Sequence, residues 1–239
     1  MAMFDPISAT GVVHLVTKTG DSYGGTCFAF RQPHVVLTAA HCVPAEAEIW
    51  VEFPRRGDRR RAIRVVKHPE ADIAVIITEP LANDDGRGYA KGTFWDCVGN
   101  WGLGEEFLAY GFPTEGPFQE TCSPTPRLFV GHYQRFMWFD APNRGRYLAG
   151  EMSIPAPAGL SGGPVFRREA PSMLTGLVTS NVETYSVLHS IDEVDDSGGR
   201  YREESRRVIQ YGLVAMLSDI EEWIDQLIPH RHGTAHSPD

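Results

Sequence analysis

Short apolar segments, each bounded by charged residues, proline or glycine, follow one another along most of the chain. In the first part of the sequence they span 11–16, 27–30, 35–38, 49–53, 62–66 and 73–78. In the second part they span 106–110, 128–130, 146–149, 165–166, 174–179 and 209–217. Segments of this length between turn residues are typical of β-strands. We expect a turn at 21–25, and a polar connection at 83–92 that separates the two series.

One segment near the C-terminus has helical periodicity instead. Apolar residues recur there at helical spacing: Ile220, Trp223, Ile224 and Leu227. Ser218 and Asp219 are expected to cap this helix, and Pro229 to end it. Many short strands with a single late helix over 218–228 predict an all-β architecture. Residues 229–239 are expected to form a flexible tail, whose three histidines could hold a metal but are more typical of a tail.

Composition and charge then narrow the classes of partner. A chain of 239 residues that is 42% hydrophobic can bury a substantial core. Its formal net charge of −9 argues against nucleic acid as a partner. We also expect no membrane partner, because no run approaches the ~18 apolar residues of a spanning helix. The first ten residues lack the features of a signal peptide, so we expect a cytoplasmic protein, or a secreted or periplasmic one if a leader was removed.

A basic run at 53–61, FPRRGDRRR, is the local exception to this acidic balance. It could bind an acidic partner or substrate. It could equally be a solvated strand edge, where charged side chains discourage pairing with another edge. Charge runs of this kind favour the second interpretation.

A single serine lies among glycines in the segment 159–163, GLSGG, and two interpretations are open. As G-x-S-x-G it matches the nucleophile elbow of α/β-hydrolase esterases, which needs a strand before the serine and a helix after it. Here two prolines precede the serine and a short strand, 164–166, follows it. The esterase triad also ends in a histidine, and the only histidines after Ser161 are His189 and those of the tail. The esterase interpretation is therefore disfavoured.

The second interpretation depends on two residues far upstream of the serine. His41 ends a short apolar strand in the segment TAAHC, 38–42. Asp72 begins another in the segment DIAVI, 72–76. Histidine, aspartate and serine thus follow one another in the order found in a chymotrypsin-like triad.

With these motifs, the chain resembles the chymotrypsin-like serine peptidases of the trypsin superfamily over about residues 10–228. The matching segments are TAAHC, DIAVI and GLSGGP (159–164), with support from AYGFP (109–113) and LTGLVTS (174–180). The bacterial, V8-like and HtrA-like members are more similar than the digestive ones. The resemblance implies one peptidase domain over 1–228, with two antiparallel six-stranded β-barrels at about 10–90 and 100–217. The active site would lie in the cleft between them.

The resemblance also assigns roles. Ser161 is the expected nucleophile, His41 its general base, and Asp72 the carboxylate that fixes the imidazole tautomer and stabilises the imidazolium. The N–H groups of Gly159 and Ser161 would form the oxyanion hole. The implied function is a serine endopeptidase without cofactor or metal, which cuts a restricted set of protein or peptide substrates through an acyl-enzyme and is controlled by an activating protein partner. The alternative is a latent scaffold that acts by binding that partner.

Three departures from trypsin modify this expectation. Leu160 replaces the aspartate that binds a newly cut N-terminus, so we expect activity without N-terminal cleavage. The expected substrate pocket carries no obvious buried charge, which predicts a small or moderately sized neutral P1 residue, the residue before the cleaved bond. Its residues are Pro155, Ala156, Thr179, Ser180, Asn181 and Gly212. The polar segment 183–207 is longer than the corresponding loop of trypsin, and predicts a lid or partner-binding element, or else a flexible surface insertion.

Four cysteines are sparse for a secreted disulfide scaffold and match no zinc ribbon. The resemblance implies a possible Cys27–Cys42 disulfide beside the histidine, although the spacing is one residue short. In an alignment with disulfide-free bacterial relatives, Cys27 replaces a glycine and Cys42 is a free thiol under the histidine. A Cys97–Cys122 disulfide is a further option that only the topology can decide.

Overall fold

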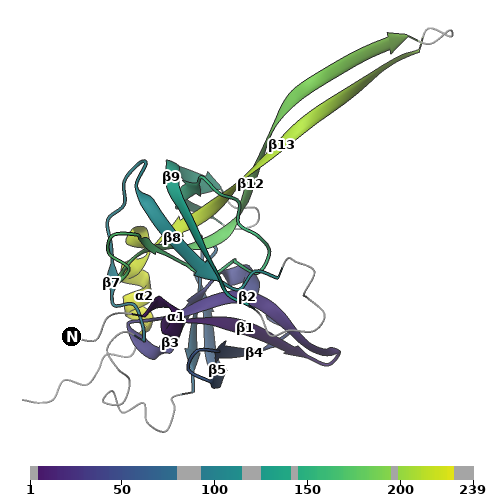
Figure 1. Ribbon diagram of the computed structural model, residues 1–239. Coiled ribbons are helices and arrows are strands. Elements are labelled where there is room, and N and C mark those ends of the chain that lie inside the picture. The colour runs from purple at the N-terminus through teal and green to yellow at the C-terminus, as the bar shows by residue number, and fades with distance from the viewer. Residues whose placement is uncertain (1–4, 80–92, 115–124, 141–144, 195–198, 229–239) are drawn as a thin grey trace, which may run out of the picture.

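The computed structural model describes residues 5–79, 93–114, 125–140, 145–194 and 199–228. β-Strands dominate it, as the apolar pattern predicts, and they form two sheets with short helices at the margins (Figure 1). The all-β prediction is confirmed. No helix within the described ranges is long and apolar enough to span a membrane. The expected tail at 229–239 and the expected connection at 83–92 lie outside the described residues.

The first six strands form a closed antiparallel barrel with the order β1-β2-β3-β6-β5-β4 (Figure 1). Their bounds are β1 Thr10–Thr17, β2 Gly20–Phe30, β3 Gln32–Thr38, β4 Glu48–Phe53, β5 Asp58–Lys67 and β6 Ala74–Thr78. Alternate residues of a strand face opposite sides, so one set of apolar side chains fills the barrel. Its core includes Val13, Cys27, Ala29, Val36, Val51, Phe53, Ala74 and Ile76. The turn expected at 21–25 is instead part of β2, because β1 and β2 continue to pair as far as Thr17 and Gly20.

The remaining strands form a seven-stranded sheet with the order β11-β8-β9-β10-β13-β12-β7. Their bounds are β7 Cys97–Val98, β8 Glu106–Gly111, β9 Arg127–Asp140, β10 Arg146–Met152, β11 Pro164–Arg167, β12 Met173–Val194 and β13 Arg200–Met216. An additional β11–β12 pairing joins the ends of six of these strands into a ring, and β7 adds to it in parallel with β12. Its apolar core includes Phe107, Tyr133, Met152, Leu160, Val165, Val178 and Val214.

A third apolar cluster joins the two sheets. Trp95 is fully buried in it, and its ring lies edge-on to Phe28 of the first barrel at 5.4 Å between ring centres and close to Phe166 of the second sheet. The C-terminal helix α2, Glu221–Leu227, buries Ile224 in the same cluster. Arg31 in the first barrel pairs with Glu221 and Asp225 of that helix. The helix therefore packs against the junction of the two sheets and helps to hold them together.

The helix start differs from the expected one. A 3-10 turn, η2 Leu217–Asp219, precedes α2, and the N-cap is Ile220, with no side-chain capping bond. Ser218 and Asp219 are occupied in that turn and cannot cap α2, so this prediction is wrong. Two short helices were not predicted: α1, Pro6–Ala9, and the 3-10 turn η1, Ala40–Cys42.

The segment 183–207 is the largest difference from the expected outline. β12 and β13 pair continuously from Gly176↔Met216 out to Val194↔Arg200. They form a long two-stranded hairpin that projects from the body of the molecule, and we call residues 183–194 and 200–209 the arm (Figure 1). Interstrand pairing along almost its whole length makes it a regular element rather than a flexible insertion.

The basic run at 53–61 is also more ordered than a solvated edge. Arg60 is buried, and its guanidinium donates to Asp58 at 2.6 Å and to the Pro33 carbonyl at 3.0 Å. Arg56 lies over the ring of Phe53. Arg61 pairs with Glu48 at 2.7 Å. Arg56, Arg60 and Arg61 are therefore held by contacts within the first barrel, whereas Arg55 and Arg59 are exposed.

Candidate active site

Pairing between β3 and β6 brings His41 and Asp72 together. Thr38 lies opposite Ala74, so the end of β3 adjoins the start of β6. η1 then turns the chain so that the backbone N–H of His41 donates to Asp72 Oδ1 at 3.1 Å. The second carboxylate oxygen, Oδ2, lies 2.6 Å from Nδ1 of the His41 ring. Both oxygens of one side chain thus orient the same histidine.

This contact determines the electrostatics of the ring. The Asp72 carboxylate is largely buried and accepts hydrogen bonds only, so Nδ1 carries a proton and Nε2 of the neutral ring is free to accept one. The hydrogen bond to Asp72 is the main cause that raises the pKa of His41 to about 10, with the neighbouring Cys42 adding to it and burial opposing it. His41 therefore becomes a neutral base only in alkaline solution in this resting arrangement.

Ser161 lies in a segment of two tight turns between β10 and β11. The Leu160 N–H donates to the Pro157 carbonyl at 3.0 Å, and the Gly163 N–H donates to the Leu160 carbonyl at 2.8 Å. Gly159 has a φ of +85°, and a Cβ there would come within 2.6 Å of the Phe112 carbonyl oxygen. Glycine is therefore required at 159 for both its backbone conformation and the lack of space.

The orientation of two peptide groups in these turns follows from hydrogen bonds to their carbonyls. The Ala158 carbonyl accepts from the Thr114 N–H at 2.8 Å, and the Leu160 carbonyl accepts from Gly163. In a trans peptide the N–H points opposite to the C=O, so the N–H groups of Gly159 and Ser161 face away from these contacts. Within the described part of the chain, neither N–H donates a hydrogen bond. Both remain available to a bound oxygen.

Thr26 of the first barrel holds this segment from the other side. Its N–H donates to the Ser161 carbonyl at 2.9 Å, and its hydroxyl donates to the Gly159 carbonyl at 2.7 Å. The same hydroxyl accepts from the Phe112 N–H at 2.9 Å. Thr26 is fully buried and joins two segments of the second half, the one around Ser161 and the one at Phe112, to β2. The sequence pattern did not single it out, although it stands beside Cys27 in a stretch matched to bacterial relatives.

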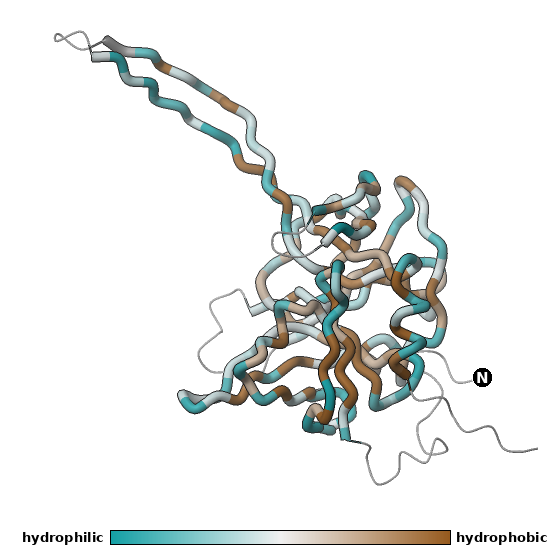
Figure 2. The backbone as a smooth tube through the Cα atoms, turned by 180° about the vertical axis from the view of Figure 1, so that it is seen from behind, coloured by the Kyte–Doolittle hydropathy of each residue, from teal (hydrophilic) through white to brown (hydrophobic). Residues whose placement is uncertain are grey.

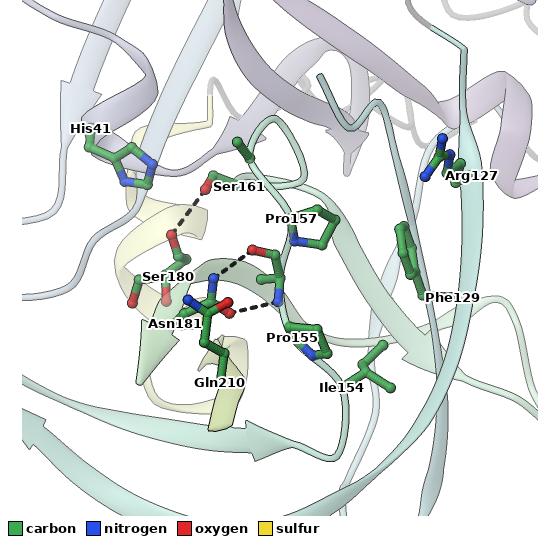
Figure 3. A pocket seen from close by; sticks show the side chains of 13 residues that line it. His41, Arg127, Phe129, Ile154, Pro155, Pro157, Ser161, Ser180, Asn181 and Gln210 are labelled. Carbon is green, nitrogen blue, oxygen red and sulfur yellow. Dashed lines mark hydrogen bonds between the residues drawn. The ribbon is translucent and has the colours of Figure 1, made fainter. Parts of the chain in front are cut away.

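The Ser161 hydroxyl has a different partner from the one expected in a triad. Among the described residues, it donates to the Thr179 carbonyl at 3.1 Å rather than to the His41 ring. Figure 3 shows the His41 ring and Ser161 at the same end of a pocket, with the serine hydroxyl directed to the strand that carries Ser180. Rotation about the Cα–Cβ bond of Ser161 moves the hydroxyl away from the Thr179 carbonyl. Release of this hydrogen bond therefore needs no backbone movement.

The pocket beside Ser161 has a volume of about 830 Å³ (Figure 3). Five of the six expected pocket residues line it: Pro155, Ala156, Thr179, Ser180 and Asn181. Gly212 does not line it but supports it, because its N–H donates to the Ile154 carbonyl at 2.8 Å. Asn181 accepts from the Ala156 N–H and donates to the Ala156 carbonyl, both at 2.7 Å. Its amide therefore fixes the wall of the pocket.

Further lining residues escaped the sequence argument: Arg127, Phe129, Ile154, Pro157, Ala158 and Gln210. Arg127 and Phe129 lie at the start of β9. This strand reaches the pocket because it lies between β8 and β10 in the sheet. Nothing local in the sequence marks them. Arg127 is the single charged lining residue apart from His41, and no carboxylate is among the lining residues described. The described residues also contain no cluster of side chains able to hold a metal ion.

The expected Cys27–Cys42 disulfide is absent, and both residues are free, buried thiols. Cys27 points into the core of the first barrel, where burial raises the pKa of its thiol. Cys42 belongs to the apolar cluster between the sheets, and its Sγ lies 3.7 Å from the Ser161 carbonyl oxygen. The two thiols thus belong to different apolar clusters. Cys97 is a free, exposed thiol, and Cys122 lies outside the described residues.

Comparison with known families adds to this geometry. A family model described as the trypsin-like peptidase domain matches residues 25–171, more than half of the chain and all of the segment from His41 to Ser161. The comparison with curated proteins found no match.

Several solved structures are similar in fold. The Rv3671c protease from M. tuberculosis, in its active form, has a TM-score of 0.62 at 14% identity, covering 92% of this chain and 81% of that chain. The HtrA-type protease AlgW with a decapeptide has a TM-score of 0.61 at 16% identity, covering 94% of this chain but only 65% of that chain. A thermostable serine protease, AL20, from an extremophilic microorganism has a TM-score of 0.57 at 14% identity, covering 92% and 96%. At these identities the similarity shows a common fold.

Proposed function

The chain belongs to the trypsin-like peptidase domain family, and on that premise we propose that it is a serine endopeptidase acting on a restricted set of protein or peptide substrates. The observation that carries this proposal is the meeting of the His41–Asp72 pair with Ser161 at one open pocket. The N–H groups of Gly159 and Ser161, which donate no hydrogen bond within the described residues, add to it.

The proposed reaction uses each of these groups in turn. Ser161 Oγ attacks the substrate carbonyl while His41 Nε2 accepts its proton, and Asp72 stabilises the imidazolium that forms. The N–H groups of Gly159 and Ser161 donate to the oxyanion of the tetrahedral intermediate. His41 then protonates the leaving amine, and an acyl-enzyme on Ser161 remains. Water, deprotonated by the same histidine, releases the acid product.

The resting contacts define what must change when substrate binds. The Ser161 hydroxyl has to leave the Thr179 carbonyl and rotate toward His41. The substrate carbonyl would at the same time occupy the space in front of the two free N–H groups. Catalytic hydrogen bonds that form only in the substrate complex are common in such sites.

The pocket walls support the expected P1 preference for a small or moderately sized neutral residue. Six of the thirteen lining residues described are proline, alanine, isoleucine or phenylalanine, and most of the others are neutral and polar. A basic P1 residue would meet Arg127 and no carboxylate, so lysine or arginine at P1 is expected to be excluded by charge repulsion.

A fluorophosphonate probe tests the proposal directly, because it reacts only with a serine activated by a base. We expect covalent labelling of the full chain, and its loss in Ser161→Ala and in His41→Ala. Thermal unfolding of both variants at the wild-type temperature would show that labelling was lost for chemical reasons. Labelling that persists in Ser161→Ala would contradict the proposal, since another residue would then be the nucleophile.

One observation favours a second candidate, a latent scaffold that a protein partner activates. The Ser161 hydroxyl is held by the Thr179 carbonyl in the resting state. If that contact keeps the site off, the wild type alone resists the probe and becomes labelled when an activating partner is added. Labelling of the wild type alone, at a rate that a peptide substrate can compete, would reject the latent scaffold.

A further inference from the structure

The arm of β12 and β13 exposes a strand edge that nothing described covers. β13 pairs with β10 only through Leu213–Ala215. From Arg200 to Ile209 its only partner within the described residues is β12, on one side. The other edge therefore presents unpaired backbone groups along ten residues, which is a template for another strand. Figure 2 shows that the arm is largely hydrophilic, with a few hydrophobic positions, and stands clear of the body of the molecule.

The charges along this edge have an unusual order. The sequence EESRR, residues 203–207, carries two acids, then Ser205, then two bases. It is antisymmetric about the serine. When two copies run antiparallel with their Ser205 residues opposite each other, Glu203 faces Arg207 and Glu204 faces Arg206 of the other copy. Directly opposed residues share a face of the sheet, so each such pair can meet.

The remaining positions in that alignment are also compatible. Tyr201 would lie opposite Ile209, and Arg202 opposite Val208. Tyr201 and Val208 are 53% and 57% exposed in the single chain, which is unusual for large apolar side chains on a regular strand. Within the described residues, Glu203 and Arg207 form no ion pair in their own chain. Glu204 pairs with Arg202 at 3.0 Å and with Arg206 at 2.6 Å, so these contacts would be exchanged for contacts with a second copy.

We propose that the exposed edge of β13 is a self-association surface, on which a second copy of this chain adds its β13 antiparallel about Ser205. The two arms would form a continuous four-stranded sheet with β12 strands outside. Four Glu–Arg pairs would cross the new junction. Charges that merely protect an edge need only be present, and they repel when one sign predominates. Here their order makes antiparallel self-pairing attractive.

The opposite edge of the arm, on β12, does not have this property. Its acids Glu183 and Asp192 stand near both ends of the arm. Residues 183–194 include no lysine or arginine, so antiparallel self-pairing of β12 would gain no Glu–Arg pair and would only bring like charges closer together, which is destabilising. The charge pattern therefore selects β13.

The register has a consequence for the pocket. Continued by five residues from Ser205, it sets Arg200 of the second copy opposite Gln210. Gln210 lines the pocket beside Ser161. The far end of each arm would thus reach the pocket mouth of the other copy, where Arg200 adds a positive charge. The association itself does not depend on peptidase activity.

Charge reversal tests the proposal by sedimentation velocity. Glu203→Arg with Glu204→Arg leaves only basic charges within 203–207, and Arg206→Glu with Arg207→Glu leaves only acidic charges there. We expect a dimeric wild type and self-association weakened at least about tenfold in each double variant, because four opposed pairs change from unlike to like charge. An equimolar mixture of the two variants, each carrying a different dye, should recover the dimer as a heterodimer.

A matched control keeps the net charge change of the basic variant but moves it off the arm. Glu46→Arg with Glu169→Arg alters two exposed acids on the body and should leave the dimer intact. Circular dichroism and fluorophosphonate labelling check that all variants fold. A monomeric wild type would overturn the proposal and assign the edge to a different partner. Variants that dimerise like the wild type, or a mixture that stays monomeric, would also overturn it.

Discussion

The two halves of the molecule hold their parts of the site in different ways. His41 and Asp72 are held within the first barrel, at the adjoining ends of β3 and β6, by two hydrogen bonds to one carboxylate. Ser161 belongs to the second sheet, but its turns are held from the first barrel through Thr26. The base is therefore assembled by pairing inside one barrel, whereas the nucleophile depends on how the two halves dock.

The backbones of the two halves approach each other closely at their junction, and this fixes the position of one half relative to the other. A Cβ on Gly162 would collide with the Thr26 carbonyl oxygen, and one on Gly25 would come within 2.8 Å of the Ser161 carbonyl oxygen. Buried Trp95 and the helix α2 then hold the halves together at the apolar cluster. Changes inside the first barrel should thus act on the base alone, and changes at the junction on the nucleophile and its neighbours.

The largest expected effect is on the base. Asp72→Asn keeps the size of the side chain but removes the carboxylate that fixes the tautomer of His41. We expect kcat on a peptide substrate to fall by about 10⁴-fold with little change in KM. The melting temperature, measured in parallel, should change little. A loss of less than tenfold would mean that Asp72 does not orient the base.

The pH dependence of fluorophosphonate labelling also tests the His41–Asp72 pair in the first barrel. The base must be neutral, and the hydrogen bond to Asp72 raises the pKa of His41 to about 10. The labelling rate should therefore rise about tenfold per pH unit through neutrality and level off near pH 10. In Asp72→Asn the carboxylate is gone, so the midpoint of the profile should move to lower pH. A wild-type midpoint near the ordinary histidine value of about 6.5 would contradict this assignment.

On the nucleophile side, Gly159→Ala is expected to have the next largest effect. Its φ of +85° and the Phe112 carbonyl leave no room for a methyl group, so the 158–159 peptide must turn and its N–H leaves the oxyanion position. We expect kcat to fall about 10²–10³-fold, with the pH midpoint of His41 unchanged. Gly57→Ala, another glycine with positive φ but open space around it, serves as the control. A shifted midpoint would show that the two halves are not separable.

Thr26 tests the junction itself. Thr26→Val keeps the shape but leaves the Gly159 carbonyl and the Phe112 N–H without their partner. Unpaired buried groups of this kind should lower the free energy of unfolding by about 1–3 kcal/mol, measured by urea denaturation. Labelling should slow as well, while Thr26→Ser should restore both. Equal stability in the valine and serine variants would show that the hydroxyl contributes nothing.

The smallest expected effect is at the pocket wall. Asn181→Ala removes both hydrogen bonds to Ala156 and frees the wall between Ile154 and Pro157. We expect KM for peptides with a neutral P1 residue to rise several-fold and kcat to change little, because the reacting groups are untouched. A fall in kcat with KM unchanged would place Asn181 in the chemistry rather than in binding.

The strands and the reactive residues of this protein could be predicted from short stretches of its sequence. The twelve apolar segments all became strands, because alternating and continuous apolar runs between turn residues can bury their side chains in few other ways. The order of His41, Asp72 and Ser161, and the glycines around the serine, pointed to the two residues that share the pocket, His41 and Ser161, and to the carboxylate that orients His41. These features depend on residue type and spacing within short stretches, which a sequence displays directly.

Other features were decided only by the tertiary structure. Packing placed the free thiols of Cys27 and Cys42 in different apolar clusters, and the position of β9 in the sheet brought Arg127 to the pocket. Thr26 and the serine segment are distant in sequence, and pairing between residues far apart leaves no local signal. The arm at 183–207 could not be told from a loop, because both of its faces are exposed and no buried face imposes a pattern. Local sequence thus determined the strands and the reactive residues, whereas contacts between distant strands determined how these residues are held.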